Sequence, residues 1–261
     1  MITRIQLSNP DFINQIRGDF AQDGFINLMG FLSAQETEEI GLNLASFINH
    51  KVPSLPSQMV FFEDKSKPNS LKQIQKLFDF SPFFHALMFG SKFEELASKL
   101  LSSSVVGKNL QYFNKPPAQN QSTPPHQDGF YFKIKPMEAL TMWLALDEVN
   151  DTNGCIRYLK GSHKSGLRAH TKSNVLGFSQ GIQHFDKECA RYEELNCYAK
   201  PGDLLVHHAL TIHRADRNHS QYQERRALGF IYYSREAREN QAAYSAYQDQ
   251  LIKELKTKKL I

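Results

Sequence analysis

The sequence predicts a mainly β protein, an antiparallel sandwich or barrel with helices packed around it. Between residues 105 and 234, short apolar stretches alternate with turns rich in Pro, Gly and Asn. No helical segments of about 10–15 residues separate these stretches, which argues against a parallel βαβ fold. Before and after this region, apolar residues recur at helical spacing. No repeat or Gly/Ser linker divides the chain, so residues 1–261 are expected to form a single domain.

The first part of the chain, about residues 11–101, is expected to be mainly helical. Apolar residues at helical spacing indicate a first helix: Phe12, Ile13, Ile16 and Phe20. Ser33 and Glu36 form a capping-box signature at the start of a second helix. Two more helices are predicted, one from about residue 81 and one over residues 92–100, and a short strand is predicted after Gly24.

The region of about residues 105–234 is expected to supply the β core, and residues 237–259 return to a helical pattern. Six strands are predicted most clearly, over residues 110–113, 130–134, 140–146, 155–159, 204–207 and 227–233. Two polar segments, residues 57–70 and 165–180, are long enough to act as lids.

Composition indicates an ordinary globular protein. The hydrophobic fraction of 41% allows a core, and the charged fraction of 22% is not that of a disordered chain. The net charge of +4 is scattered, apart from a basic stretch at residues 253–259 that we interpret as a solvated face, so no nucleic-acid partner is expected. No run of about 18 apolar residues occurs, so no membrane partner is expected either.

Cysteine usage favours a reducing location. Cys155, Cys189 and Cys197 are an odd number without CxxC spacing, which predicts neither a disulfide framework nor a structural zinc site. The N-terminal residues contain no apolar signal segment. A cytoplasmic protein is the simplest interpretation.

The strand-rich region contains a candidate metal site. His126 and Asp128 are two residues apart, and in an extended segment such residues point to the same side, where both can bind one cation. A third ligand must come from elsewhere, and His213, just after the predicted strand at residues 204–207, is the best candidate. Two histidines and a carboxylate form the facial triad typical of non-haem iron oxygenases, which leaves positions open for cosubstrate and dioxygen.

An HxD tripeptide alone is a weak signal, and each histidine taken singly is more often structural. Arg225, twelve residues after His213, strengthens the iron interpretation because a guanidinium can hold the far carboxylate of 2-oxoglutarate with two parallel hydrogen bonds. Strand alternation alone leaves open whether Arg225 or Arg226 faces inward. Two other classes remain, a His-Asp-His metal-dependent hydrolase and a non-catalytic metal-binding jelly roll, and neither needs this arginine.

Three segments carry a resemblance to the phytanoyl-CoA dioxygenase-like family: LQYFNKPPAQNQSTPPHQDGFYF, LTMWLALDEVNDTNGCIRYLKGSHKSG, and KPGDLLVHHALTIHRADRN with ERRALGFIYYS. The resemblance covers about residues 20–234. It implies a double-stranded β-helix (jelly-roll, cupin-like) core, Fe(II), 2-oxoglutarate as cosubstrate, and O2. It also implies iron ligation by His126, Asp128 and His213, and a cosubstrate pocket formed by Arg225, Thr141 and Trp143.

The reaction implied by the resemblance is hydroxylation of an aliphatic C–H bond, with release of succinate and CO2. Gln111, Lys115 and Arg157 are candidate substrate contacts, although a solvent-facing strand explains Lys115 equally well and a packed surface arginine explains Arg157. If they face the pocket, a small anionic or polar metabolite is favoured, such as an amino acid, a carboxylate or a phosphonate. An acyl-CoA thioester is the alternative.

His207 and His208 precede His213 by six and five residues. One of them could orient a metal ligand. A buried structural histidine is the simpler interpretation of each.

Overall fold

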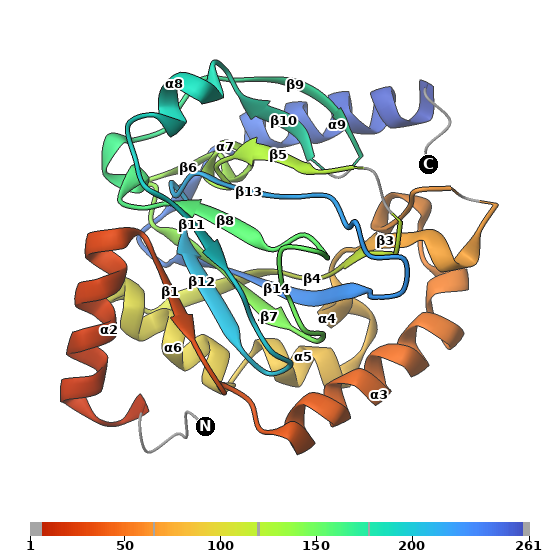
Figure 1. Ribbon diagram of the computed structural model, residues 1–261, viewed down its shortest axis with the longest axis horizontal. Coiled ribbons are helices and arrows are strands. Elements are labelled where there is room, and N and C mark those ends of the chain that lie inside the picture. The colour runs from red at the N-terminus through yellow and green to blue at the C-terminus, as the bar shows by residue number, and fades with distance from the viewer. Residues whose placement is uncertain (1–6, 65, 119–120, 177, 258–261) are drawn as a thin grey trace.

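A computed structural model describes residues 7–64, 66–118, 121–176 and 178–257 of the chain. Two β-sheets face each other in it, and helices cover the outer face of the larger sheet (Figure 1). The larger sheet has the strand order β1-β12-β7-β14-β4-β3-β2. Its strands are β1 (Phe25–Leu28), β2 (Val60–Phe62), β3 (Leu71–Ile74), β4 (Val105–Lys115), β7 (Ala139–Ala145), β12 (Leu204–His208) and β14 (Arg225–Ser234).

The smaller sheet has the order β11-β8-β13-β5 and completes a double-stranded β-helix with the larger one. Its strands are β5 (Thr123–His126), β8 (Ile156–Leu159), β11 (Glu194–Cys197) and β13 (His213–Ala215). Two further strand pairs lie beside the sandwich: β9 (His170–Val175) with β10 (Phe178–Ile182), and β6 (Ile134–Lys135) with β15 (Arg238–Glu239). Pairing between described strands is antiparallel throughout.

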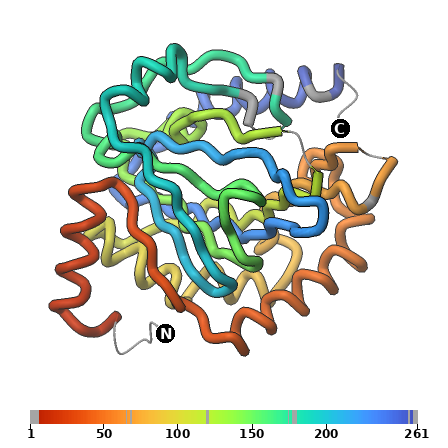
Figure 2. The backbone as a smooth tube through the Cα atoms, in the orientation of Figure 1, coloured from red at the N-terminus to blue at the C-terminus, as the bar shows by residue number. Residues whose placement is uncertain are grey.

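Chain order and spatial order differ strongly in this fold. Figure 2 shows the N-terminal strand β1 beside β12, and the register pairs Phe25 with His207. The C-terminal helix α9 (Gln241–Thr257) lies near the β9–β10 pair, where Lys172 and Glu254 form an ion pair of 2.5 Å. Both contacts join segments that are distant in sequence.

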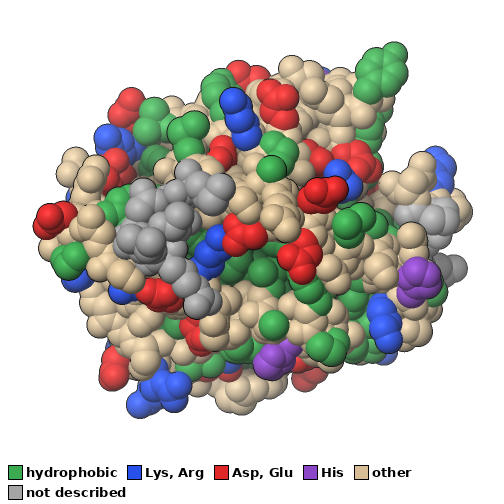
Figure 3. Space-filling view, turned by 90° about the horizontal axis from the view of Figure 1, so that it is seen from below, with side chains coloured by type: hydrophobic (Ala, Val, Ile, Leu, Met, Phe, Trp, Pro, Cys, Tyr) green, Lys and Arg blue, Asp and Glu red, His purple; other side chains and the backbone are tan. Residues whose placement is uncertain are grey.

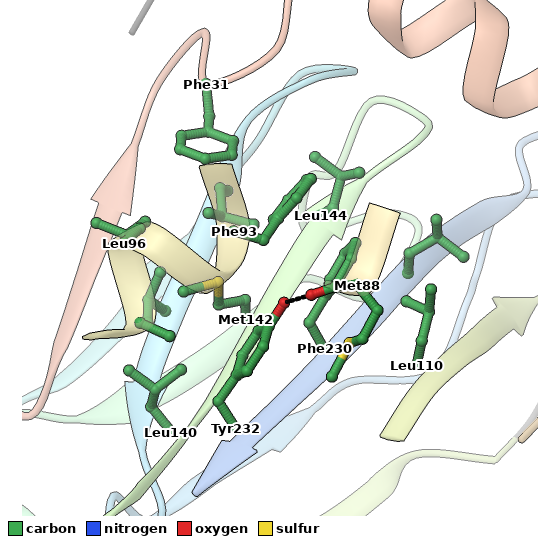
Figure 4. Close-up of a cluster of buried hydrophobic side chains, with 14 of the residues drawn as sticks. Phe31, Met88, Phe93, Leu96, Leu110, Leu140, Met142, Leu144, Phe230 and Tyr232 are labelled. Atoms are coloured by element: carbon green, nitrogen blue, oxygen red, sulfur yellow. Dashed lines mark hydrogen bonds between the residues drawn. The ribbon is translucent and has the colours of Figure 1, made fainter. Parts of the chain in front are cut away.

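The main hydrophobic core lies between the larger sheet and its helices: α2 (Pro10–Asp23), α3 (Ala34–His50), α4 (Leu77–Phe80), α5 (Pro82–Met88) and α6 (Lys92–Leu101). The outward-pointing residues of the sheet, such as Met142 and Phe230, supply one side of this core (Figure 4). Phe230 stacks on Phe93 of α6 with ring centroids 4.1 Å apart, and the Tyr232 hydroxyl donates to the Met88 carbonyl over 2.6 Å. Packing of this kind fixes which face of the sheet is outside.

The other face of the same strands points between the two sheets and is more polar. Because side chains alternate along a strand, the residues between the core positions face inward. In β7 these are Thr141 and Trp143, and in β14 the first is Arg225. The outer face of the sheet is thus apolar, whereas its inner face combines apolar side chains with polar ones such as Thr141 and Arg225.

Several sequence-based predictions are confirmed. The first helix is α2, with Ile13, Ile16 and Phe20 buried, and Ser33 and Glu36 form the predicted capping box of α3. Helices α5 and α6 and strands β1, β4, β7, β8, β12 and β14 lie where they were predicted, within a few residues. The helical tail is α9, and residues 258–259 of the predicted tail lie outside the described residues.

One predicted element is wrong. Residues 130–134 are not a strand, because α7 (Gly129–Phe132) makes one helical turn there and only Ile134 continues into β6. The turn closes when the amide of Tyr131 donates to the carbonyl of Asp128. The first part of the chain is mainly helical, as expected, but β2 and β3, which were not predicted, extend the larger sheet. Short apolar segments do not distinguish strand from helix by periodicity.

The surface carries both charge signs. On the face shown in Figure 3, acidic and basic side chains are interspersed among apolar ones. No helix in the described ranges is long and apolar enough to cross a membrane. The cysteines Cys155, Cys189 and Cys197 are all free.

A partly buried histidine on the outer face of β12, His208, predicts a loss of stability in acid. Burial lowers the pKa of His208 to about 4 from its usual 6.5, so below pH 6.5 the unfolded chain binds the proton that the folded protein excludes. Between pH 7.5 and pH 5.0, His208 should therefore cost about 2 kcal/mol of unfolding free energy. The test is denaturant unfolding at both pH values with a chelator present. The loss of unfolding free energy should be smaller in His208→Gln than in the wild type. It should be unchanged in His219→Gln, where the substituted side chain is exposed. An equal pH dependence in wild type and His208→Gln would contradict it.

Candidate functional site

A cavity of about 390 Å³ lies between the two sheets, and three candidate metal ligands open onto it. His126 ends β5, Asp128 lies in the turn that follows, and His213 begins β13. His126 and His213 are direct cross-strand partners in the smaller sheet. One ligand atom from each of the three residues lies within 4.8 Å of the others, which is close enough for a single metal ion.

The two histidines present the same nitrogen to the site. Nδ1 of His126 donates to the Pro124 carbonyl over 2.8 Å, and Nδ1 of His213 donates to the Thr211 carbonyl over 3.0 Å. A neutral imidazole whose Nδ1 carries the proton has a free lone pair on Nε2. The Nε2 atoms of His126 and His213 lie 3.4 and 3.7 Å from Oδ1 of Asp128. Two imidazole nitrogens and one carboxylate oxygen therefore converge.

His126 and Asp128 are brought together by a different feature of the backbone than the strand alternation predicted from the sequence. Asp128 has helical backbone angles (φ −59°, ψ −34°), so strand alternation does not bring it beside His126. The turn into α7 does so instead. Gln127 points away and is fully buried, where its side-chain amide donates to the carbonyls of Gly166 and Leu210.

The second oxygen of Asp128 is held by two donors. The Thr141 hydroxyl donates to Oδ2 over 2.5 Å, and Nε2 of His207 lies 3.0 Å from the same oxygen. Burial opposes ionisation of this carboxyl, but the neighbouring side chains of His126 and His207 hold the pKa of Asp128 well below its usual range. Burial, reinforced by His126 and His207, also lowers the pKa of His213, which keeps its imidazole neutral. The set is thus an ionised carboxylate with a neutral imidazole from His213.

Arg225 also lines the cavity and faces inward. It is 5% exposed, one guanidinium nitrogen donates to the Gly154 carbonyl over 3.0 Å, and the guanidinium lies 5.2 Å from the Trp143 ring centroid. Its Nε is buried without a hydrogen-bond partner. Arg226 points outward and forms an ion pair of 2.7 Å with Asp147. Of the two neighbouring arginines between which strand alternation could not choose, Arg225 therefore faces the cavity.

Arg225 is paired across the sheet with a second buried cation. Lys115 of β4 is its direct cross-strand partner and is 7% exposed. Burial, together with the charge of Arg225, lowers the pKa of Lys115 well below its usual value. Neither side chain has a carboxylate within 4.0 Å among the residues that the structure describes. Since like charges directly opposite each other are destabilising, this end of the cavity is suited to an anion.

The three candidate substrate contacts separate into two groups. Gln111 lines the cavity, where its side-chain carbonyl accepts a hydrogen bond from Gln73 over 2.9 Å. Lys115 lines it too, but its ammonium group donates to the backbone carbonyls of Asp216 (2.6 Å) and Gln121 (3.3 Å). Both residues come from the inner face of β4.

Arg157 does not belong to this cavity, so its expected role as a substrate contact is corrected. It follows the inward-facing Ile156 in β8 and therefore points away from the sandwich interior. Its guanidinium pairs with Asp216 at 2.5 Å and lies 3.7 Å from Glu194. Of the two alternatives for Arg157, the structure therefore supports a packed arginine on the surface.

Sequence reasoning missed the outer wall of the cavity. Helix α9 contributes Tyr244, Tyr247 and Leu251, and α7 contributes Tyr131. The spacing of 244, 247 and 251 marks one helical face, and this was the available signal. The two polar segments expected as lids, at residues 57–70 and 165–180, both supply lining residues, among them Phe61 and Val175.

The family model and the curated relatives that match this chain point to the same family. The family model described as phytanoyl-CoA dioxygenase (PhyH) matches residues 20–227. The peroxisomal phytanoyl-CoA dioxygenase of Bos taurus is 27% identical over 206 residues, which cover 76% of this chain and 57% of the relative. Phytanoyl-CoA dioxygenase 1 of Oryza sativa subsp. japonica is 30% identical over 172 residues, which cover 60% and 59%. The match thus spans a little under three fifths of these relatives' length.

Solved structures share the fold at low sequence identity. The epimerase SnoN from nogalamycin biosynthesis, in complex with Fe3+, alpha ketoglutarate and nogalamycin RO, has a TM-score of 0.72 at 21% identity, covering 88% of this chain and 86% of SnoN. EctD from S. alaskensis with bound Fe has a TM-score of 0.72 at 18% identity, covering 84% and 76%. These similarities support the double-stranded β-helix assignment.

Proposed function

This chain belongs to the phytanoyl-CoA dioxygenase (PhyH) family, and we propose that it is an Fe(II)- and 2-oxoglutarate-dependent dioxygenase. In this proposal it hydroxylates an aliphatic C–H bond of a small polar or anionic metabolite and releases succinate and CO2. One observation carries the proposal. A His-Asp-His cluster and a buried arginine without a carboxylate partner among the described residues line the same cavity.

The residues that line the cavity fit both Fe(II) and 2-oxoglutarate. His126, Asp128 and His213 offer two imidazole nitrogens and one carboxylate oxygen, the ligand set of non-haem Fe(II) oxygenases. Such a triad leaves the cavity side of the metal open for cosubstrate and O2. Arg225 fits the far carboxylate of 2-oxoglutarate because its guanidinium is a rigid fork with an unpaired buried Nε.

When bound, Fe(II) and 2-oxoglutarate supply an oxidant for unactivated C–H bonds through oxidative decarboxylation of the cosubstrate with O2. The protein orients the cosubstrate and substrate and keeps water away from the reacting atoms. Arg225 would fix the cosubstrate at the end of the cavity that also holds Lys115. Trp143, against the guanidinium, restricts where the side chain can lie. The aromatic side chains of Tyr131 and Tyr247 would keep water from the reacting atoms.

The cavity supports a compact polar substrate. Its volume of about 390 Å³ must also hold the cosubstrate, and Gln73 and Gln111 present amide groups to it. Lys76 also lines the cavity, has no carboxylate within 4.0 Å among the described residues, and has a pKa lowered by burial. A partly buried ammonium group of this kind favours a carboxylate or phosphonate group on the substrate. An amino acid would satisfy the same lining.

An acyl-CoA thioester is the second candidate. The names of the curated relatives favour it, since several are phytanoyl-CoA dioxygenases. A CoA ester would place only its acyl end in this cavity and would leave its nucleotide outside. Succinate release during a screen of amino acids, carboxylates, phosphonates and acyl-CoA esters separates the two candidates.

An anaerobic titration tests the reaction class. Metal-free protein is titrated with Fe(II) and then with 2-oxoglutarate, while the visible charge-transfer band of the chelate is followed. A saturable band is expected, absent in His126→Ala and weakened in Arg225→Ala. No band, together with tight Zn²⁺ binding, would favour a metal-dependent hydrolase, and binding of neither metal would favour a non-catalytic jelly roll.

A further inference from the structure

His207 is aimed at the carboxylate of Asp128 from the larger sheet. Its Nε2 lies 3.0 Å from Asp128 Oδ2, and its Nδ1 lies 2.8 Å from the hydroxyl of Tyr158. His207 is 2% exposed and Tyr158 is fully buried, so this hydrogen bond is shielded from water. Tyr158 comes from β8 in the opposite sheet, and its ring stacks on Phe25 with centroids 4.6 Å apart. The chain of hydrogen bonds therefore spans the sandwich.

The direction of the two hydrogen bonds follows from their partners. An ionised carboxylate only accepts hydrogen bonds, so Nε2 of His207 must carry a proton. In a neutral imidazole Nδ1 is then bare and accepts from the Tyr158 hydroxyl. Burial raises the pKa of Tyr158 well above its usual value, so the hydroxyl keeps the proton it donates. Tyr158 thus donates to His207, and His207 donates to Asp128.

We propose that His207 is a positioning residue which, with Thr141, holds Oδ2 of Asp128 so that only Oδ1 is free to bind the metal. Thr141 and His207 are cross-strand partners on β7 and β12, and both donate to Oδ2. Oδ1 is the oxygen that lies nearest to Nε2 of His126 and His213. One-oxygen ligation leaves the metal one more open position than chelation by both oxygens would. The inference rests on the proposed function for the presence of a metal.

The neighbouring histidine provides a contrast within the same strand. His208 is the next residue of β12 and points to the opposite face, where its ring lies 5.6 Å from that of His163. It is also a largely buried histidine, but it does not contact Asp128. A packing role alone predicts similar consequences at both positions, whereas the positioning role predicts an effect on metal binding only at His207.

Co(II) binding to the metal-stripped full chain tests the proposal without turnover. The affinity is measured by titration, and the visible d–d spectrum reports the ligand set. His207→Phe keeps a ring but loses the donor, and it should bind Co(II) about 10–100-fold more weakly, with an altered spectrum. His207→Gln keeps an N–H donor and should stay within about threefold of wild type. His208→Gln is the matched control, with wild-type affinity and spectrum expected.

The tautomer of His207 is tested independently by long-range ¹H–¹⁵N NMR of the metal-free protein. The His207 signals are identified as those missing in His207→Gln. The proposal expects a protonated Nε2 and a bare Nδ1, and the reverse pattern would overturn it even if His207→Phe does not fold.

The outcomes separate this inference from the proposed function. Wild-type Co(II) affinity and spectrum in His207→Phe would overturn the positioning role while leaving the metal site intact. Failure of the wild-type protein to bind Co(II) would overturn the proposed function, and the positioning role with it. Equal weakening in His207→Phe and His208→Gln would show a packing effect and would also overturn the inference.

Discussion

Asp128→Ala should abolish turnover. The substitution removes the only anionic ligand of the cluster and the acceptor for the Thr141 and His207 donors, so Fe(II) should no longer be held in the cavity. We expect the rate of 2-oxoglutarate conversion to succinate to fall by at least about 10³-fold. This rate can be measured before the substrate is identified, because uncoupled cosubstrate decarboxylation also releases succinate. The chelate band should be lost in parallel.

A matched control for Asp128→Ala is Asp151→Ala. The Asp151 side chain is 58% exposed, accepts a hydrogen bond from the Tyr198 hydroxyl and does not line the cavity. Succinate release should stay at the wild-type rate in this variant. Retention of coupled product formation by Asp128→Ala would contradict the ligand assignment, and the carboxylate would then have to be supplied by another residue.

Arg225→Ala should weaken 2-oxoglutarate binding more than any other substitution outside the metal ligands. The variant loses two charge-assisted hydrogen bonds to the cosubstrate, which together correspond to an increase in Kd of about 10²–10³-fold. Arg225→Lys keeps the positive charge but loses the two-pronged guanidinium, so its Kd for 2-oxoglutarate should rise by about tenfold, between those of the wild type and Arg225→Ala. The measurement is anaerobic titration of the Fe(II)-loaded protein with 2-oxoglutarate, followed through the chelate band.

The adjacent Arg226 supplies the control for Arg225. Its guanidinium pairs with Asp147 on the outer side of the sheet, so Arg226→Ala should leave the 2-oxoglutarate Kd within about twofold of wild type. If Arg226→Ala weakens binding and Arg225→Ala does not, the inward assignment of Arg225 as the cosubstrate residue is wrong. Weakening by both would indicate a distortion of β14.

The candidate ligands are accessible from sequence because their chemistry is carried by residue type and order. His126, Asp128 and His213 can be named from the amino-acid sequence alone, and so can Arg225 as one of two neighbouring arginines. The physical reason predicted for the His126–Asp128 pair is nevertheless wrong, since a helical turn and not strand alternation brings the two side chains together. The local sequence GFYF resembles a strand in composition, and its turn is closed by backbone hydrogen bonds that periodicity does not reveal.

Other residues could be assigned only from the folded chain. Arg157 was a candidate substrate contact with a packed surface arginine as the alternative, and β8 turns it outward to Asp216. The wall formed by α9 depends on a helix late in the chain packing beside the cavity between the two sheets. Contacts between segments so distant in sequence leave no local pattern, because they depend on how the elements pack.

The sequence by itself determined most of the helices and strands, the strand-rich core and the residue types able to hold iron and 2-oxoglutarate. Only the tertiary structure decided that Arg225 rather than Arg226, and His207 rather than His208, faces the cavity. The physical reason is the two-residue period of a strand. Alternation assigns residues to two faces, but the packing of helices against one face of the larger sheet decides which face lies inside the sandwich.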